Sequence, residues 1–142
     1  MRLNFMLIDD NEIDLFVNQR YIEKVLGDVE IITFIRAKMA LDYLRSLAER
    51  PNGDFIFVPD IIFLDINMPE MNGFGFLNEF SMLDNPVLAN IKIYMLSSST
   101  NLNDIIDAER HTSCNGFISK PLTSEVVSRL VNESKIQLRT DK

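Results

Sequence analysis

The sequence has very few residues that could crosslink the chain, and it has no segment suited to span a membrane. It contains one cysteine, Cys114, so no disulfide can form within the chain. No apolar run approaches the roughly 20 residues that a membrane-spanning helix needs, and the first residues have no signal-peptide layout. These absences favour a cytoplasmic protein. Cys114 falls in an expected loop with no histidine beside it, which indicates a buried or incidental thiol rather than a nucleophile.

Positive charge is also scarce. The chain has 14 basic and 21 acidic residues, a net charge of −7, and no basic run. Such a chain would repel phosphate groups, so direct binding to nucleic acid or to an anionic membrane is not expected. The only histidine, His111, lies in a polar stretch and is interpreted as a solvated surface residue without a functional role.

What the chain does have is enough apolar material for one core. Of its 142 residues, 46% are apolar, which suits one compact domain and is too little for two ordinary ones. We expect a single domain over residues 1–142, with a core over about residues 3–136 and a short polar tail.

Short apolar runs alternate with amphipathic stretches, the pattern of a parallel α/β fold. Five such units predict a doubly wound five-stranded parallel sheet with strand order 2-1-3-4-5 and helices on both faces. The predicted strands are residues 3–8, 30–35, 61–64, 91–96 and 116–119. The predicted helices are residues 13–25, 37–47, 73–80 and 101–109, and a last one after Pro121 that Thr123 or Ser124 caps.

Apolar residues at helical spacing predict which face of each helix is buried. The first helix is expected to bury Ile13, Phe16, Val17, Tyr21 and Val25. The second is expected to bury Ala37, Ala40, Leu41, Leu44 and Leu47. The stripes of the later helices are Phe76, Leu77 and Phe80, then Leu102, Ile105 and Ile106, then Val126, Val127, Leu130 and Val131.

The connection over residues 49–59 breaks the alternation. Pro51, Asn52 and Gly53 mark a turn. The apolar run at residues 55–58 favours a short extra strand packed on the core. The alternative is an exposed apolar patch that binds a partner.

Polar side chains stand where the predicted strands end. Asp9 and Asp10 follow the first strand, Asp65 the third, Ser97 the fourth and Lys120 the fifth. In an open parallel sheet, ligands bind beyond the carboxyl ends of the strands, where the strand order reverses. Three carboxylates, one hydroxyl and one ammonium are therefore expected in one crevice.

This set of groups is suited to a phosphoryl group. Three close carboxylates raise one another's pKa unless a cation neutralises them, and Mg²⁺ is the hard, oxygen-liganded ion common inside cells. Such an ion can hold a phosphoryl oxygen during transfer to a carboxylate nucleophile. Lys120 and Ser97 would hold other phosphoryl oxygens by charge and by hydrogen bond.

The chain resembles a CheY-like receiver domain of a two-component response regulator over nearly its whole length. The matching motifs are Leu-Ile-Asp-Asp-Asn at residues 7–11, Ile-Phe-Leu-Asp-Ile-Asn-Met-Pro at 62–69, Met-Leu-Ser-Ser at 95–98 and Lys-Pro at 120–121. Each motif alone has an ordinary structural explanation as a cap, a turn or a helix entry. All of them in the correct order, at successive strand ends, indicate the family.

The resemblance implies a flavodoxin-like fold and a role for each matching residue. Asp65 would accept the phosphoryl group with help from Lys120 and Ser97, and Ser97 and Phe117 would form the conformational switch. Mg²⁺ would be bound by Asp9, Asp10, Asp65 and the backbone carbonyl of Asn67. The Lys120–Pro121 peptide bond would be cis. Asn67 and Ser99 would flank the path of the hydrolytic water and tune the lifetime of the phosphoryl group.

Two positions depart from the commoner family pattern. Ser97 replaces a threonine and keeps the hydroxyl. Phe117 replaces a frequent tyrosine, so the switch can move a ring but cannot use a phenolic hydrogen bond.

The resulting prediction is a stand-alone response regulator and not an enzyme. Its phosphodonor would be a sensor histidine kinase or a histidine phosphotransfer protein. Its target would be a separate protein that binds the face made by the fourth helix, the fifth strand and the fifth helix, or a further histidine that receives the phosphoryl group in a relay. Two alternatives stay open: a receiver-like binding module that is never phosphorylated, and a phosphohydrolase using an aspartyl-phosphate. In the second case an acid is expected where Asn67 stands.

Overall fold

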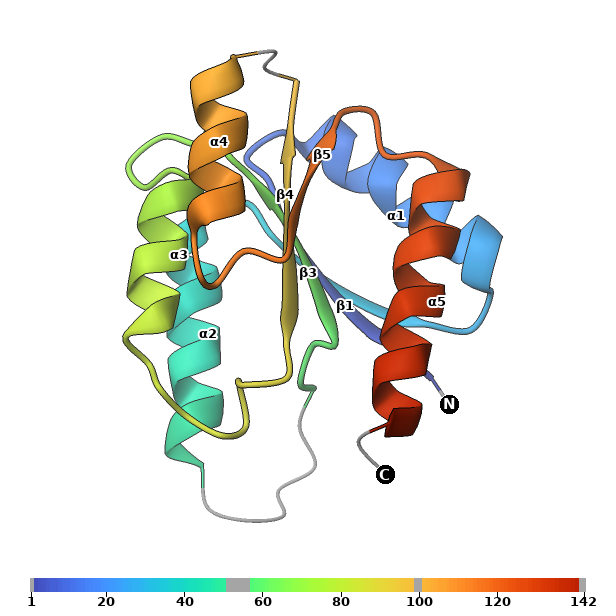
Figure 1. The fold of residues 1–142 in the computed structure, drawn as a ribbon, viewed down its shortest axis with the longest axis horizontal. Coiled ribbons are helices and arrows are strands. Elements are labelled where there is room, and N and C mark those ends of the chain that lie inside the picture. Colours follow the sequence, from blue (N-terminus) through green and yellow to red (C-terminus); the bar gives the residue numbers. More distant parts are fainter. Residues whose placement is uncertain (1, 51–56, 99–100, 141–142) are drawn as a thin grey trace.

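The computed structural model describes residues 2–50, 57–98 and 101–140. Over these ranges five strands alternate with five helices (Figure 1). The strands are β1 (Asn4–Ile8), β2 (Glu30–Phe34), β3 (Ile61–Asp65), β4 (Lys92–Ser97) and β5 (Gly116–Ser119). The helices are α1 (Glu12–Leu26), α2 (Ala37–Glu49), α3 (Gly73–Ser81), α4 (Leu102–Arg110) and α5 (Ser124–Thr140). Within the described residues, no helix is long and apolar enough to cross a membrane.

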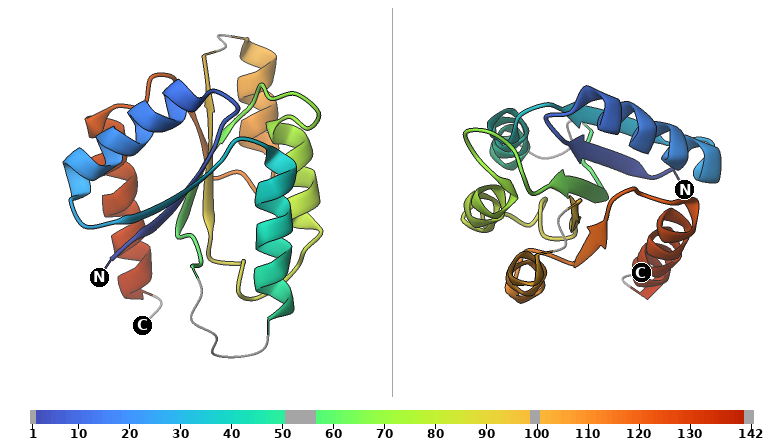
Figure 2. Two further views of the ribbon diagram at one scale, coloured as in Figure 1. Left: turned by 180° about the vertical axis from the view of Figure 1, so that it is seen from behind. Right: turned by 90° about the horizontal axis from the view of Figure 1, so that it is seen from above.

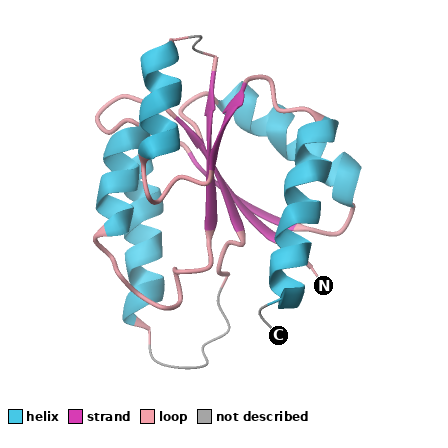
Figure 3. Cartoon of the chain, viewed as in Figure 1, coloured by secondary structure: helices cyan, strands magenta, loops and turns pink. Residues whose placement is uncertain are grey.

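The strands form one parallel sheet in the order β2-β1-β3-β4-β5, as predicted. Helices α1 and α5 cover one face, and α2, α3 and α4 cover the other (Figures 1, 2 and 3). Every strand is joined to its successor through a helix, so all carboxyl ends lie along the same edge. The strand order reverses between β1 and β3, which places the expected crevice beside those two strands.

Both faces of the sheet carry a hydrophobic core. On one face, Ile62 and Leu64 of β3 pack with the buried stripe of α2 and with Phe76 of α3. On the other face, Ile61 and Phe63 pack with the buried residues of α1 and α5. β3 is buried along its whole length, because a central strand between two helix layers has no solvent-facing side.

Two strands end one residue later than predicted. Asp65 is the last residue of β3 and is paired in register with Leu96. Ser97 is the last residue of β4 and is paired with Ser119. The ladder of backbone hydrogen bonds therefore includes Asp65 and Ser97 and fixes their backbone. The sequence pattern located the strands by their apolar residues alone, so it left out these two polar residues.

Three of the predicted helix stripes are confirmed. The stripe of α2 is fully buried, and Phe76 and Leu77 of α3 are buried with Phe80 packed against them. In α5, Val127, Leu130 and Val131 are buried and Val126 is packed against them, and Thr123 accepts a hydrogen bond from the Val126 N–H as its cap. In α4 the prediction was wrong for Leu102, whose side chain is exposed. Ala108 is the buried residue of this short helix.

The stripe predicted for α1 was wrong for four of its five residues. Ile13 and Phe16 are 73% and 64% exposed, and Val17 and Tyr21 are exposed as well. The helix buries Leu15, Asn18 and Ile22 instead, with Val25 packed against the core. Both faces of α1 carry apolar residues at helical spacing, so periodicity could not decide between them.

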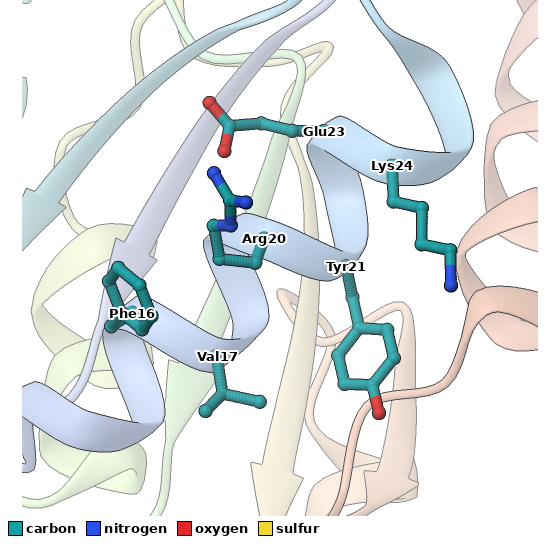
Figure 4. Close-up of a pocket in the computed structure, with 6 residues that line it drawn as sticks. All are labelled: Phe16, Val17, Arg20, Tyr21, Glu23 and Lys24. Atoms are coloured by element: carbon teal, nitrogen blue, oxygen red, sulfur yellow. The ribbon is translucent and has the colours of Figure 1, made fainter.

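The exposed side of α1 forms a shallow pocket. The pocket is lined by Phe16, Val17, Arg20, Tyr21, Glu23 and Lys24. Figure 4 shows these side chains on the outer side of the helix, away from the sheet. The outer side of α1 therefore presents an apolar surface that also carries the charged side chains of Arg20, Glu23 and Lys24.

The orientation of α1 gives a direct stability test. Phe16→Ala should change the free energy of unfolding by no more than about 0.5 kcal/mol, because the ring makes little core contact. Ile22→Val removes one methylene from a side chain with no exposed area, and should cost about 0.5–1.5 kcal/mol. Urea titration of both variants checks this. A larger loss for Phe16→Ala would contradict the exposed orientation.

The connection before β3 is only partly described. Phe57 and Val58 form no strand, so that part of the predicted extra strand was wrong. Val58 is half-buried against the core, and the Phe57 carbonyl accepts a hydrogen bond from the Tyr43 hydroxyl. The remaining residues of the predicted turn and run, 51–56, lie outside the described residues.

Candidate functional site

Three carboxylates meet at the carboxyl edge of the sheet. Asp9 and Asp10 follow β1, and Asp65 ends β3. One oxygen from each lies within 4.8 Å of the others. Asp9 and Asp65 are buried, whereas Asp10 is exposed. Three converging carboxylate oxygens, open on one side, form the donor set that a hard divalent cation such as Mg²⁺ prefers.

Asp9 is fixed by two hydrogen bonds. Its Oδ1 accepts the Asn11 N–H at 2.9 Å, and its Oδ2 accepts a proton of the Lys120 ammonium at 2.9 Å. Asn11 in turn caps α1, because its side chain accepts the N–H groups of Ile13 and Asp14. The first turn of α1 and the carboxylate are therefore held by the same short loop.

The ammonium of Lys120 lies at the centre of the site. Its Nζ is 2.9 Å from Asp9 Oδ2, 3.0 Å from Asp14 Oδ2 and 3.2 Å from Asp65 Oδ1. These contacts raise the pKa of Lys120 above its ordinary value despite partial burial, which lowers it. The lysine is therefore a permanent cation at neutral pH.

The backbone around Lys120 explains this placement. The Lys120 N–H donates to the Ser97 carbonyl at 2.8 Å, which extends the β4–β5 ladder by one step. The Lys120–Pro121 peptide bond is cis, as predicted. The lysine therefore leaves β5 at the edge where Asp9 and Asp65 lie.

Burial perturbs the acids of the site. The pKa of Asp65 is raised to about 6, because desolvation and the nearby charge of Asp9 raise it more than Lys120 lowers it. Desolvation also raises the pKa of Asp9, against the hydrogen bonds from Asn11 and Lys120. The fold thus holds two carboxylates in a state that a bound cation would stabilise.

The raised pKa of Asp65 predicts a pH-dependent stability. The folded protein binds this proton more tightly than the unfolded chain, whose carboxyl has an ordinary pKa near ~4. Stability in a chelator should therefore fall as pH rises from about 4 to 6, and Asp65→Asn should remove that loss. At pH 7 we expect Asp65→Asn to be more stable by on the order of 2 kcal/mol. Urea titrations of both proteins at pH 4 and pH 7 check this; an unchanged difference between them would contradict it.

The other predicted residues surround the acids. Ser97 is fully buried at the end of β4. Phe117 lies on β5, half-buried, in register with Met95 and packed against the core that α4 covers. Asn67 is exposed in the loop after β3, two residues beyond Asp65. Ser99 lies outside the described residues.

Sequence reasoning missed Asp14 as a member of this site. Its side chain, 40% exposed, reaches Lys120 from the first turn of α1. An acid in the first turn of a helix is ordinarily explained by the helix dipole. The available signal was its place in the first turn of the helix that begins at the edge where the acids gather.

Two residues interpreted from sequence alone have definite surroundings. His111 is not simply solvated: its Nε2 is 2.8 Å from Asn78 Oδ1 of α3, and its Nδ1 accepts the Ser113 N–H. Burial raises the pKa of the Cys114 thiol, and its sulfur lies 3.2 Å from the Gly116 carbonyl. A raised thiol pKa agrees with the interpretation of Cys114 as a structural residue.

Comparison with known proteins agrees with this geometry. The family model of the response regulator receiver domain matches residues 5–132. Response regulator Rcp1 of Synechocystis is 29% identical over 110 residues, which cover 77% of this chain and 71% of Rcp1. The chain spans between 18% and 30% of the length of four curated plant response regulators that it matches.

Solved structures show the same fold. A two-component response regulator from Cytophaga hutchinsonii superposes with a TM-score of 0.81 at 29% identity, over 94% of this chain and 98% of the other. The phosphorylated cyanobacterial phytochrome response regulator RcpA has a TM-score of 0.72 at 27% identity, over 99% and 96%.

The parallel sheet and its acidic edge define an α/β protein of the flavodoxin-like receiver class. The chain belongs to the response regulator receiver domain family, the regulated component of two-component systems.

Proposed function

We propose that the chain is a stoichiometric phosphoacceptor in which Asp65 takes a phosphoryl group from a histidine of a partner protein. The observation that carries this proposal is the Lys120 ammonium placed between Asp65 and Asp9, beside Asp10. A carboxylate nucleophile next to a fixed cation and a site for a second one suits phosphoryl transfer, in which electrostatic stabilisation dominates.

The transfer follows from the positions of these groups. An oxygen of Asp65 forms a bond to phosphorus while the phosphorus–nitrogen bond to the partner's histidine breaks, and the imidazole nitrogen keeps the electron pair. Lys120 holds a phosphoryl oxygen by charge, and Ser97 donates a hydrogen bond to another. Asp9, Asp10, Asp65 and the Asn67 carbonyl would hold Mg²⁺, which supplies neutralisation of the charge on the phosphoryl oxygens.

We further propose that turnover is limited to slow self-catalysed phosphorylation and dephosphorylation. A phosphohydrolase needs a general acid or base near the aspartyl-phosphate, and the position two residues beyond Asp65 carries the neutral side chain of Asn67. An aspartyl-phosphate that forms once and hydrolyses slowly serves as a signal rather than as an intermediate of an enzyme.

The output is proposed to be a change in the face made by α4, β5 and α5. When Ser97 moves toward the phosphoryl oxygens, Phe117 can occupy the space beside β4, because it is half-buried between β5 and the core under α4. This biases a two-state equilibrium of that face, which a downstream protein would read. The phosphodonor would be a sensor histidine kinase or a histidine phosphotransfer protein. The structural relative RcpA in its phosphorylated form supports phosphorylation of a chain with this fold.

Chemical labelling tests the proposal. Wild-type protein incubated with Mg²⁺ and acetyl phosphate should gain the mass of one phosphoryl group, which hydroxylamine removes and a chelator prevents. Peptide mapping should place the group on Asp65. Absence of labelling would favour a receiver-like binding module instead, and labelling at another residue would exclude Asp65 as the acceptor. Release of phosphate from a panel of phosphate monoesters would identify a phosphohydrolase.

A further inference from the structure

The Lys120 ammonium is surrounded by three carboxylates. It donates hydrogen bonds to Asp9 at 2.9 Å and to Asp14 at 3.0 Å, and it forms an ion pair with Asp65 Oδ1 at 3.2 Å. A phosphoryl oxygen that binds Lys120 therefore competes with these carboxylate oxygens for the ammonium. Which carboxylate gives way determines how easily the site accepts a phosphoryl group.

The three carboxylates differ in how readily they can be released. Asp9 is 4% exposed and is held at its other oxygen by the Asn11 N–H. Asp65 is 7% exposed and is itself the acceptor. Asp14 is 40% exposed at the rim, so water can solvate it once the lysine leaves. The release leaves the helix cap intact, because the Asn11 side chain binds the backbone N–H of Asp14 and not its carboxylate.

We propose that Asp14 is a positioning residue that holds Lys120 in the unphosphorylated site and is exchanged for an incoming phosphoryl oxygen. The inference rests on the proposed function and adds a residue to it. Asp14 keeps the ammonium oriented before transfer. Its own negative charge, at the rim that a phosphodonor must pass, opposes the approach of a phosphate dianion.

The exchange means that Asp14 weakens the binding of a phosphodonor to the site. Without the Asp14 carboxylate, Lys120 keeps its hydrogen bond to Asp9 and its ion pair with Asp65, and the donor that Asp14 had bound becomes available for a phosphoryl oxygen. The site also carries one negative charge less. Asp14→Asn should therefore lower the half-saturating concentration of acetyl phosphate about three- to tenfold, with a smaller change in the maximal rate of labelling.

The matched control is Glu12→Gln. Glu12 lies two residues earlier in the same first turn of α1, and its side chain is exposed. This substitution removes the same charge from the helix N-terminus without removing a Lys120 contact. It should leave the half-saturating concentration within about twofold, because an exposed charge is screened by water and salt. Asp14→Glu, which restores the charge, should return the value toward that of the wild type.

A second measurement does not depend on phosphorylation. In ¹⁵N-lysine spectra, the ammonium protons of Lys120 should exchange with water severalfold faster in Asp14→Asn than in the wild type or in Glu12→Gln. Lys120→Arg assigns the signal. Unchanged exchange in Asp14→Asn would overturn the positioning role, whatever the labelling shows.

The outcomes separate the two proposals. If wild-type protein is labelled and Asp14→Asn has the half-saturating concentration of Glu12→Gln, the exchange is wrong and the proposed function stands. If wild-type protein is not labelled, the proposed function fails, and the ammonium exchange alone decides whether Asp14 positions Lys120.

Discussion

Asp65→Asn is expected to gain no phosphoryl group under conditions in which the wild-type protein gains one. An amide lacks the anionic oxygen that attacks phosphorus. Intact-mass measurement after incubation with Mg²⁺ and acetyl phosphate checks this. Urea titration of the variant in the labelling buffer shows whether it is folded, which separates this loss from unfolding.

Asp60→Asn is the control for this experiment. Asp60 lies at the opposite end of β3, where desolvation also raises its pKa and its Oδ2 accepts the Asn4 N–H at 2.8 Å. Asp60 is a half-buried aspartate, and within the described residues it forms no ion pair with Lys120. Asp60→Asn should be labelled at the wild-type rate. Equal labelling of Asp65→Asn and the wild type would exclude Asp65 as the acceptor.

The sheet could be predicted from sequence because each strand has a distinctive composition. The continuous apolar run of β3 requires a sheet with helices on both faces. Right-handed connections between parallel strands then bring the polar residues at the strand ends to one edge. Asp9, Asp65 and Lys120 were predicted together because parallel strands bring their carboxyl ends to one edge. Their exact contacts were not predicted, since distances depend on side-chain rotamers and on the backbone after each strand.

The orientation of α1 could not be predicted for a related reason. Phe16 and Ile22 belong to opposite faces of the helix, and both faces read as apolar. In the folded protein, the Asn11 cap and the contact between Asp14 and Lys120 anchor the first turn. These contacts are made with residues before and far beyond the helix, so the spacing of apolar residues within the helix carries no information about them.

The contact between α3 and the residue after α4 was not predicted for the same reason. His111 directly follows α4 and lies in a polar stretch, which from sequence indicates a solvated residue. In the fold it reaches Asn78, 33 residues earlier, and accepts the Ser113 N–H. Because its Nδ1 accepts this hydrogen bond, the N–H at Nε2 is the donor to Asn78 Oδ1. The contact ties the start of the α4–β5 connection to α3, beside the face proposed to change on phosphorylation.

Gly73→Val is expected to destabilise the protein by about 3 kcal/mol or more. Gly73 begins α3, and its N–H donates to the Ile66 carbonyl at 2.9 Å. A Cβ at this position would lie 2.9 Å from the Asp65 carbonyl oxygen and 2.7 Å from the Met95 Cε. The methionine can move, but the carbonyl belongs to the last residue of β3 and cannot move without displacing the strand end.

Gly75→Val is the matched control, because the same substitution two residues later meets only flexible side chains. Its Cβ would lie 3.1 Å from Met71 Cγ and 3.7 Å from Asn72 Oδ1, so its stability should stay within about 1 kcal/mol of the wild type. Gly73→Val should also slow labelling of the folded fraction by at least about tenfold, since a small displacement of Asp65 misaligns it with Lys120. Urea titration and labelling rates measure the two effects. Equal stability of the two variants would show that the carbonyl of the phosphoacceptor tolerates a side chain against it, and that α3 does not fix the position of Asp65.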